Sequence, residues 1–112
     1  MKTFGLNPYL PYWENVPDGE PHVFGDRVYI FGSHDKQDGD SFCEEDYVGW
    51  SAPINDLGNW RCEGVIYKKE QDPINGASYD KEIPVYDDAM DAEGMLHNLY
   101  APDVAQGPDG RY

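Results

Sequence analysis

The chain has 112 residues, the length of one small domain, with 22 acidic residues against 8 basic ones and a formal net charge of −14. A surface this acidic repels phosphate backbones and anionic lipid, which argues against nucleic-acid and membrane-surface partners. Aromatic residues make up 14% of the chain, whereas disordered acidic chains are poor in them. We therefore expect a folded, strand-rich protein whose rings and carboxylates suit a carbohydrate partner.

The amino-terminal residues 1–8 lack the apolar stretch of a signal peptide. No apolar run approaches the roughly 20 residues that span a bilayer. If Met1 is the native start, the sequence predicts a cytoplasmic protein.

Four short segments carry the β-branched and aromatic residues typical of strands: 22–24, 27–31, 47–51 and 60–67. A Gly-Asp pair at 25–26 predicts a tight hairpin turn between the first two, and the polar residues 55–59 predict the turn between the last two. Trp50 and Trp60 are expected in the core. Four such strands in antiparallel succession have the form of one propeller blade.

The polar residues 68–98 predict a long connection, with helical character only around 87–95. After it, the pattern of residues 21–29 (Pro-His-Val-Phe-Gly-Asp-Arg-Val-Tyr) returns about 80 positions later in residues 102–112 (Pro-Asp-Val-Ala-Gln-Gly-Pro-Asp-Gly-Arg-Tyr). Both have Pro-x-Val, then a glycine–aspartate turn, then an arginine that leads into a tyrosine-bearing strand. This repetition predicts a second blade.

The expected organisation is thus a first blade over about 18–67, a connection over about 68–98, and the start of a second blade over about 99–112. The chain ends one or two residues into the next predicted strand. Since repeat architectures generally need about three or more units, the sequence predicts a truncated array.

Cys43 and Cys62 have no C-x-x-C spacing and no neighbouring histidine cluster, so we expect neither a zinc site nor any other metal or cofactor. Buried free thiols are the favoured state, with a disulfide between them left open. The acidic residues 35–40 lack the order of a calcium loop and are expected to be solvated. Ser33, His34 and Asp35 are consecutive and cannot form a catalytic relay, so His34 is expected at a pocket rim instead.

Two of the 22 acids stand apart, because Asp18 and Asp103 each lie in a Pro/Gly-bounded segment just before a predicted strand pair. The innermost strands of propeller blades line the central axis, so equivalent positions of successive blades converge on one pocket. Glycoside hydrolysis requires carboxylates brought together in this way. The alternative, that both are ordinary turn and cap aspartates, stays open from spacing alone.

Several segments resemble, in the same order, the opening of glycoside hydrolase family 43. Residues 7–11 (Asn-Pro-Tyr-Leu-Pro), 17–24 (Pro-Asp-Gly-Glu-Pro-His-Val-Phe) and 27–35 (Arg-Val-Tyr-Ile-Phe-Gly-Ser-His-Asp) come first. Residues 56–60 (Asp-Leu-Gly-Asn-Trp) are similar to the family's Asp-Leu-x-x-Trp segment. Residues 99–104 (Leu-Tyr-Ala-Pro-Asp-Val) are similar to the Trp-Ala-Pro-Asp-Val motif that opens its second blade.

This resemblance implies an all-β fold: the N-terminal blade and the start of the second blade of a five-bladed β-propeller, truncated. It also implies a β-xylosidase or α-L-arabinofuranosidase that hydrolyses plant pentosans with inversion, with an oligosaccharide or polysaccharide as its partner. The alternative is an inactive carbohydrate-binding or degenerate fragment without turnover.

The same resemblance implies that Asp18 is the general base and that Asp103 orients the general acid and raises its pKa. The acid itself would be a glutamate of the third blade, beyond Tyr112. The first motif departs from the family's Ala-Asp-Pro form, which leaves Glu20 as the alternative base; Asp18 is preferred because it lies five residues before Val23.

Three further residues are expected to bind substrate: Trp13, His34 and Tyr100. Trp13 and Tyr100 flank the two motif aspartates and would form walls that stack on sugar, with core packing as the alternative for each ring.

Overall fold

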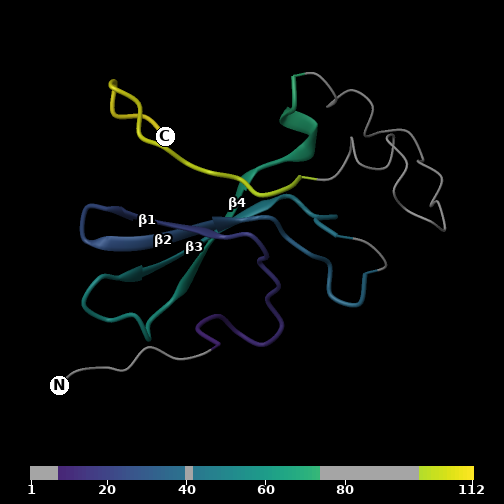
Figure 1. Cartoon of the computed structure of the whole chain (residues 1–112), viewed down its shortest axis with the longest axis horizontal. Coiled ribbons are helices and arrows are strands. Elements are labelled where there is room, and N and C mark those ends of the chain that lie inside the picture. Colours follow the sequence, from purple (N-terminus) through teal and green to yellow (C-terminus); the bar gives the residue numbers. More distant parts are fainter. Residues whose placement is uncertain (1–7, 40–41, 74–98) are drawn as a thin grey trace.

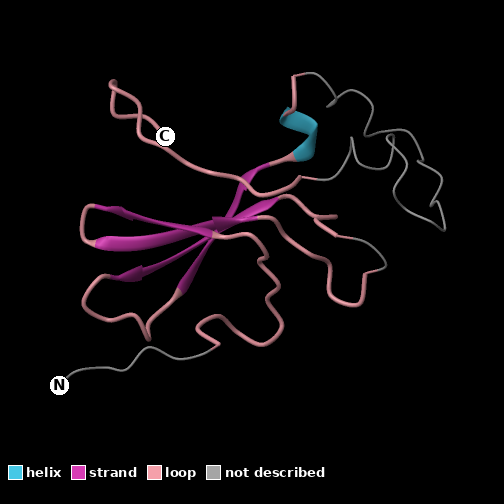
Figure 2. Cartoon of the chain, viewed as in Figure 1, coloured by secondary structure: helices cyan, strands magenta, loops and turns pink. Residues whose placement is uncertain are grey.

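The chain folds into one four-stranded antiparallel sheet with the strand order β1-β2-β3-β4 (Figures 1 and 2). The strands are β1 (Glu20–Phe24), β2 (Arg27–Gly32), β3 (Tyr47–Pro53) and β4 (Arg61–Tyr67), and a short 3-10 helix η1 (Lys69–Gln71) follows. The computed structural model describes residues 8–39, 42–73 and 99–112. All four predicted strands are confirmed, whereas the helical character predicted for 87–95 lies outside the described residues.

The predicted hairpin turn at residues 25–26 is also confirmed. Phe24 pairs with Arg27, so the connection contains only two residues. Gly25 has φ 64°, a left-handed conformation that glycine adopts without steric cost. The antiparallel sheet that results is compatible with one propeller blade.

One face of the sheet carries the buried core. Ile30 of β2 lies opposite Trp50 of β3, and Gly32 lies opposite Val48, so these side chains share a face. The core residues on this face are buried: Ile30, Val48, Trp50 and Ala52. The loop of residues 8–19 packs on this face at Ile30, Gly32 and Trp50. It lies on the opposite side of the sheet from the C-terminal segment (Figure 1).

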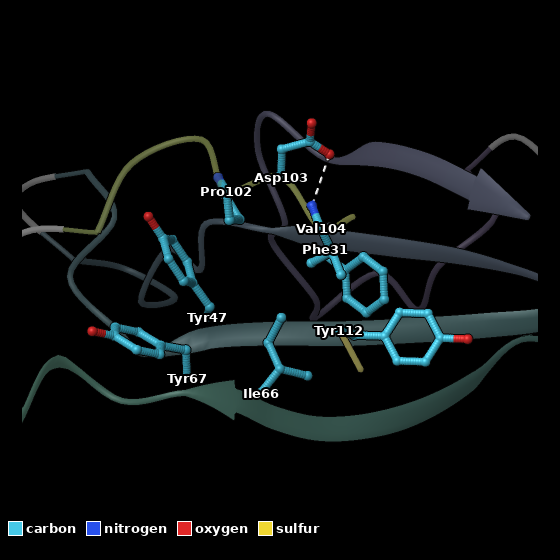
Figure 3. Close-up of a pocket in the computed structure, with 8 residues that line it drawn as sticks. All are labelled: Phe31, Tyr47, Ile66, Tyr67, Pro102, Asp103, Val104 and Tyr112. Atoms are coloured by element: carbon cyan, nitrogen blue, oxygen red, sulfur yellow. Dashed lines mark hydrogen bonds between the residues drawn. The ribbon is translucent and has the colours of Figure 1, made fainter. Parts of the chain in front are cut away.

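The other face is aromatic and is crossed by the C-terminal segment, residues 99–112. The rings of Tyr29 and Phe31 stack with centroids 5.8 Å apart, and Tyr112 meets Phe24 edge-on at 4.7 Å. A cavity of about 470 Å³ separates the segment from the sheet (Figure 3). Its lining is mostly apolar: Phe31, Tyr47, Ile66, Tyr67, Pro102, Asp103, Val104 and Tyr112.

Two sequence expectations need correction. Trp60 is only half-buried, because its ring packs on Tyr9 outside the core and its Nε1 donates to the Leu57 carbonyl. Cys43 and Cys62 are both free thiols, but only Cys43 is buried.

The C-terminal segment contains the second predicted glycine–aspartate turn. Residues 108–110 do form a turn, in which the Gly107 amide donates to the Arg111 carbonyl over 2.7 Å. Arg111 and Tyr112 form no ladder with β1–β4 in the described part of the chain, and the second blade stays a prediction. Within that part, no helix is long and apolar enough to cross a membrane.

Candidate functional site

Three loops meet at one end of the sheet. Glu20, which begins β1, pairs with Phe31 near the end of β2, and Gly32 pairs with Val48 near the beginning of β3. The loops that precede β1, follow β2 and precede β3 therefore leave the sheet at the same end. Residues 99–103 dock against this end, as the following contacts show.

The segment before the second motif is attached through its backbone. The Ala101 amide donates to the Ser33 hydroxyl over 2.6 Å, and the Leu99 amide donates to the Cys43 carbonyl over 3.3 Å. The Tyr47 hydroxyl donates to the Tyr100 carbonyl over 2.7 Å. Ser33 is fully buried, so its contact with Ala101 fixes where the motif begins.

Asp103 is held by a histidine of the first strand. Its Oδ1 lies 2.6 Å from Nε2 of His22 and accepts a second hydrogen bond from the Val104 amide at 2.7 Å. The His22 hydrogen bond, and to a lesser extent the Val104 amide, lower the pKa of Asp103. The second carboxylate oxygen points away from Val104 (Figure 3). Asp103 is therefore an anion held by two hydrogen bonds at the edge of the aromatic cavity, with 70% of its side chain exposed.

Asp18 lies in the turn just before β1, with an exposed side chain and φ 56°. Burial, and after it the charges of Asp35 and Asp18, raise the pKa of the Cys43 thiol. No hydrogen bond joins Asp18 to Asp103 among the residues that the structure describes, and Asp103 lines the aromatic cavity while Asp18 does not.

His34 lies between two carboxylates. Its Nε2 is 2.7 Å from Oε1 of Glu14, and its Nδ1 is 3.0 Å from Oε2 of Glu45. The Glu14 side chain is only 3% exposed, and its Oε2 also accepts a hydrogen bond from Trp50 Nε1 at 2.8 Å. His34 is 21% exposed, so it keeps a limited accessible edge at this end of the sheet.

The side chains of the consecutive Ser33, His34 and Asp35 form hydrogen bonds with three different residues. Ser33 holds Ala101 and His34 holds Glu14, whereas the Asp35 carboxylate accepts the Cys43 amide hydrogen bond at 2.7 Å. Each of the three side chains therefore has its own partner outside the triplet. Across residues 8–39, 42–73 and 99–112, no group of three or more His, Cys, Asp or Glu is arranged to hold a metal ion.

The two predicted stacking rings are both accessible. Trp13 is 50% exposed and Tyr100 is 42% exposed. Trp13 packs one side toward Trp50, with centroids 6.1 Å apart. Neither ring is core, so each retains a surface that a sugar can contact.

Two residues at this site were not singled out from the sequence. His22 occupies the place in the first repeat that Asp103 occupies in the second, and the repeat could have suggested that the two meet. Glu14 carries no comparable signal, because nothing in its loop distinguishes it from the other acids until its burial is known.

Neither a protein-family profile nor a solved structure matches the chain. A curated relative from Thermoclostridium stercorarium, described as "Xylosidase/arabinosidase", is 52% identical over all 112 residues. The chain spans only 20% of the length of that relative, so the similarity concerns that fifth of the relative alone.

Proposed function

We propose that this chain is part of a glycosidase that hydrolyses xylosides or arabinofuranosides of plant pentosans. The observation that carries the proposal is the 52% identity, over every residue of the chain, to a protein described as a xylosidase/arabinosidase. The acidic, aromatic composition and the exposed rings of Trp13 and Tyr100 are consistent with a carbohydrate substrate.

The proposed role of Asp103 is to orient the general acid and raise its pKa. A fixed negative charge near a carboxylic acid disfavours loss of the acid's proton. The hydrogen bond from His22, which lowers the pKa of Asp103, supports this role because it keeps Asp103 ionised while the acid stays protonated.

The proposed role of Asp18 is to deprotonate the attacking water. A base must remain ionised in the working pH range, and the exposed position of Asp18 keeps its carboxylate solvated. An inverting enzyme places its base and acid about 6.5–9.5 Å apart, with room for water between them. The acid would be a glutamate supplied from outside residues 1–112.

We further propose that the sheet is the first blade of a five-bladed β-propeller of glycoside hydrolase family 43. Its four-stranded antiparallel order supports this, as does the contact between His22 and Asp103, which stand at equivalent places of the internal repeat. Equivalent positions of successive blades are neighbours around a propeller axis, and repeats of this kind contact their sequence neighbours.

The test is hydrolysis of nitrophenyl β-xyloside and nitrophenyl α-L-arabinofuranoside by the complete polypeptide that contains these residues. Nuclear magnetic resonance of the first product would give its anomeric configuration. We expect release of nitrophenol and a first sugar product whose anomeric configuration is inverted. Hydrolysis with retained configuration would remove the inverting mechanism, and no hydrolysis of either substrate would remove the proposed activity.

A second candidate is a carbohydrate-binding chain without turnover. It is favoured by the two accessible rings of Trp13 and Tyr100, which can contact sugar without hydrolysing it. Binding of xylo- or arabino-oligosaccharide by the complete polypeptide, with no hydrolysis over many hours, would select this alternative.

A further inference from the structure

Glu14 has the most buried carboxylate for which an ion pair is described at this end of the sheet, and the proposed catalytic roles do not use it. Only 3% of its side chain is exposed. Oε2 accepts the Trp50 Nε1 hydrogen at 2.8 Å, and Oε1 lies 2.7 Å from His34 Nε2. Trp50 belongs to β3 and His34 follows β2, so one carboxylate joins the loop before β1 to two other parts of the sheet.

The backbone around Glu14 is fixed as well. The Glu14 amide donates to the Pro11 carbonyl over 3.0 Å, which closes a turn. The Asn15 amide donates to Oε1 of Glu14 at 3.1 Å, and the Asn15 carbonyl accepts the Asp35 amide hydrogen bond at 3.0 Å. The loop therefore cannot shift at residues 14–15 without breaking contacts to both the side chain and the backbone.

Close packing extends this restraint from Glu14 to the proposed base. A Cβ atom at Gly32 would collide with Val16 Cγ1, and one at Gly19 would lie 2.6 Å from Ile30 Cγ2. The loop thus lies directly against β2 on both sides of Asp18. Only residues 15–17 separate Glu14 from Asp18, so the anchored carboxylate and the proposed base belong to one short stretch of the loop.

We propose that Glu14 is a positioning residue: its buried carboxylate, held by Trp50 and His34, fixes the loop that carries Asp18. This inference rests on the proposed function for the role of Asp18, but the anchoring itself does not. A catalytic group displaced by about 1 Å can lose about 100-fold in rate. Glu14 contributes this accuracy without touching the substrate.

The carboxylate is better suited to this task than a neutral side chain. Each of its oxygens accepts a hydrogen bond from a different donor, and hydrogen bonds to an ionised acceptor are roughly twice as strong as neutral ones. Burying the charge is tolerable only while its partners are present. The anchor is therefore stable in one geometry and costly in any other.

The test combines hydrogen exchange with kinetics on the complete polypeptide. In Glu14→Ala, we expect amides of residues 9–19 to exchange at least about 10-fold faster, while amides of β3 and β4 stay within about twofold of wild type. We expect kcat to fall about 10- to 100-fold while KM stays within about threefold of wild type, because the base is misplaced but substrate binding is unchanged. Glu14→Gln, which keeps the shape and one acceptor oxygen, should recover part of both effects.

Glu70→Gln is the matched control, since it removes one charge from an exposed side chain that pairs only loosely with Lys68 at 3.6 Å. It should change neither readout. If Glu14→Ala does not fold, Trp50→Phe provides the comparison, because it removes the Nε1 donor and keeps an aromatic ring; the same local increase in exchange is expected.

Two results would overturn the inference. Unchanged exchange of residues 9–19 in the folded Glu14 variants would remove the anchor, whatever the activity. Faster exchange with wild-type kcat would remove its effect on Asp18. A wild-type protein that hydrolyses no glycoside would overturn the proposed function and the catalytic part of this inference, and the exchange rates would still decide the anchoring part.

Discussion

Nε2 of His22 lies 2.6 Å from Oδ1 of Asp103, a contact between residues 81 positions apart. The first residue lies in β1 and the second lies in the segment that crosses the sheet. The contact therefore fixes the orientation of the Asp103 carboxylate relative to the end of the sheet where the proposed base also lies.

Asp103→Asn should reveal whether this carboxylate acts as a charge. Asparagine keeps the acceptor oxygen for His22 and Val104 but removes the negative charge. We expect kcat to fall by about 10-fold or more, and the basic limb of its pH profile to move to lower pH, because the general acid loses a neighbouring anion that raised its pKa. Asp109→Asn, in the nearby turn, is the control. A wild-type pH profile in Asp103→Asn would contradict the assignment.

Asp18→Asn should abolish most turnover, since the amide cannot accept a proton from water. A positioned general base contributes about 100- to 10,000-fold, so kcat should fall by that order while substrate affinity, measured by calorimetry, stays within about threefold. Asp38→Asn is a closely matched control, because Asp38 is also exposed and also has positive φ, at 58°. Comparable rates in the Asp18 and Asp38 variants would dismiss Asp18 as the base.

Glu63 should make stability depend on acid pH. A hydrogen bond from the Ser51 hydroxyl and then one from Arg61 lower the pKa of Glu63 from its ordinary value of 4.5. Because the folded pKa is the lower one, the stabilisation is complete above pH 4.5 and is lost as the pH falls through the folded pKa. The unfolding free energy of Glu63→Gln should therefore fall less than that of wild type as the pH is lowered from about 6 to about 3.

Urea denaturation at each pH would measure this difference. Glu70→Gln serves again as control, because the Glu70 side chain is 69% exposed and the Glu63 side chain only 26%. An identical pH dependence in Glu63→Gln and wild type would show that the Ser51 and Arg61 contacts do not stabilise the folded state.

The two thiols should react at very different rates. Cys62 is exposed, whereas Cys43 is 2% exposed and burial raises its pKa. With a chromogenic disulfide at neutral pH, we expect one thiol per chain, Cys62, to react fast. The second thiol, Cys43, should react at least about 100-fold more slowly. Denaturant should merge the two phases, and Cys62→Ser should remove the fast one. Two fast equivalents in the native protein would contradict the burial of Cys43.

Gly32→Ala should disturb the loop that carries Asp18. The added methyl group collides with Val16 Cγ1, and overpacking of this kind costs about 1–3 kcal/mol of unfolding free energy. Val16→Ala in the same chain makes room for the methyl group, so the double variant should be less destabilised than the sum of the single variants. Additive losses, measured by urea denaturation, would show that Gly32 and Val16 are not in contact.

The strands could be predicted because their signals are local. Runs such as residues 27–31 combine β-branched and aromatic side chains and are bounded by turn residues, so both the strand and the Gly25 turn follow from neighbours in sequence. Burial was harder to predict. Trp60 and Cys62 are less buried than expected because Trp60 lies beside β4 and Cys62 lies in it. This strand is at the edge, and its outer side has no neighbouring strand in the described sheet.

The site was predictable where two segments resemble one another, and not where the contacts are long-range. Asp18 and Asp103 follow from motifs, and the structure places both in segments that reach one end of the sheet. The burial of Glu14 depends on Trp50, 36 positions away, and no local pattern encodes that distance.

The backbone conformation of Asp18 has a further consequence for stability. A residue other than glycine at φ 56° is held in a conformation that glycine adopts at no steric cost. Asp18→Gly should therefore leave the free energy of unfolding unchanged or slightly raised while removing the carboxylate altogether. At this one position the best residue for folding and the proposed residue for chemistry differ, and a screen for thermal tolerance alone would tend to discard the aspartate.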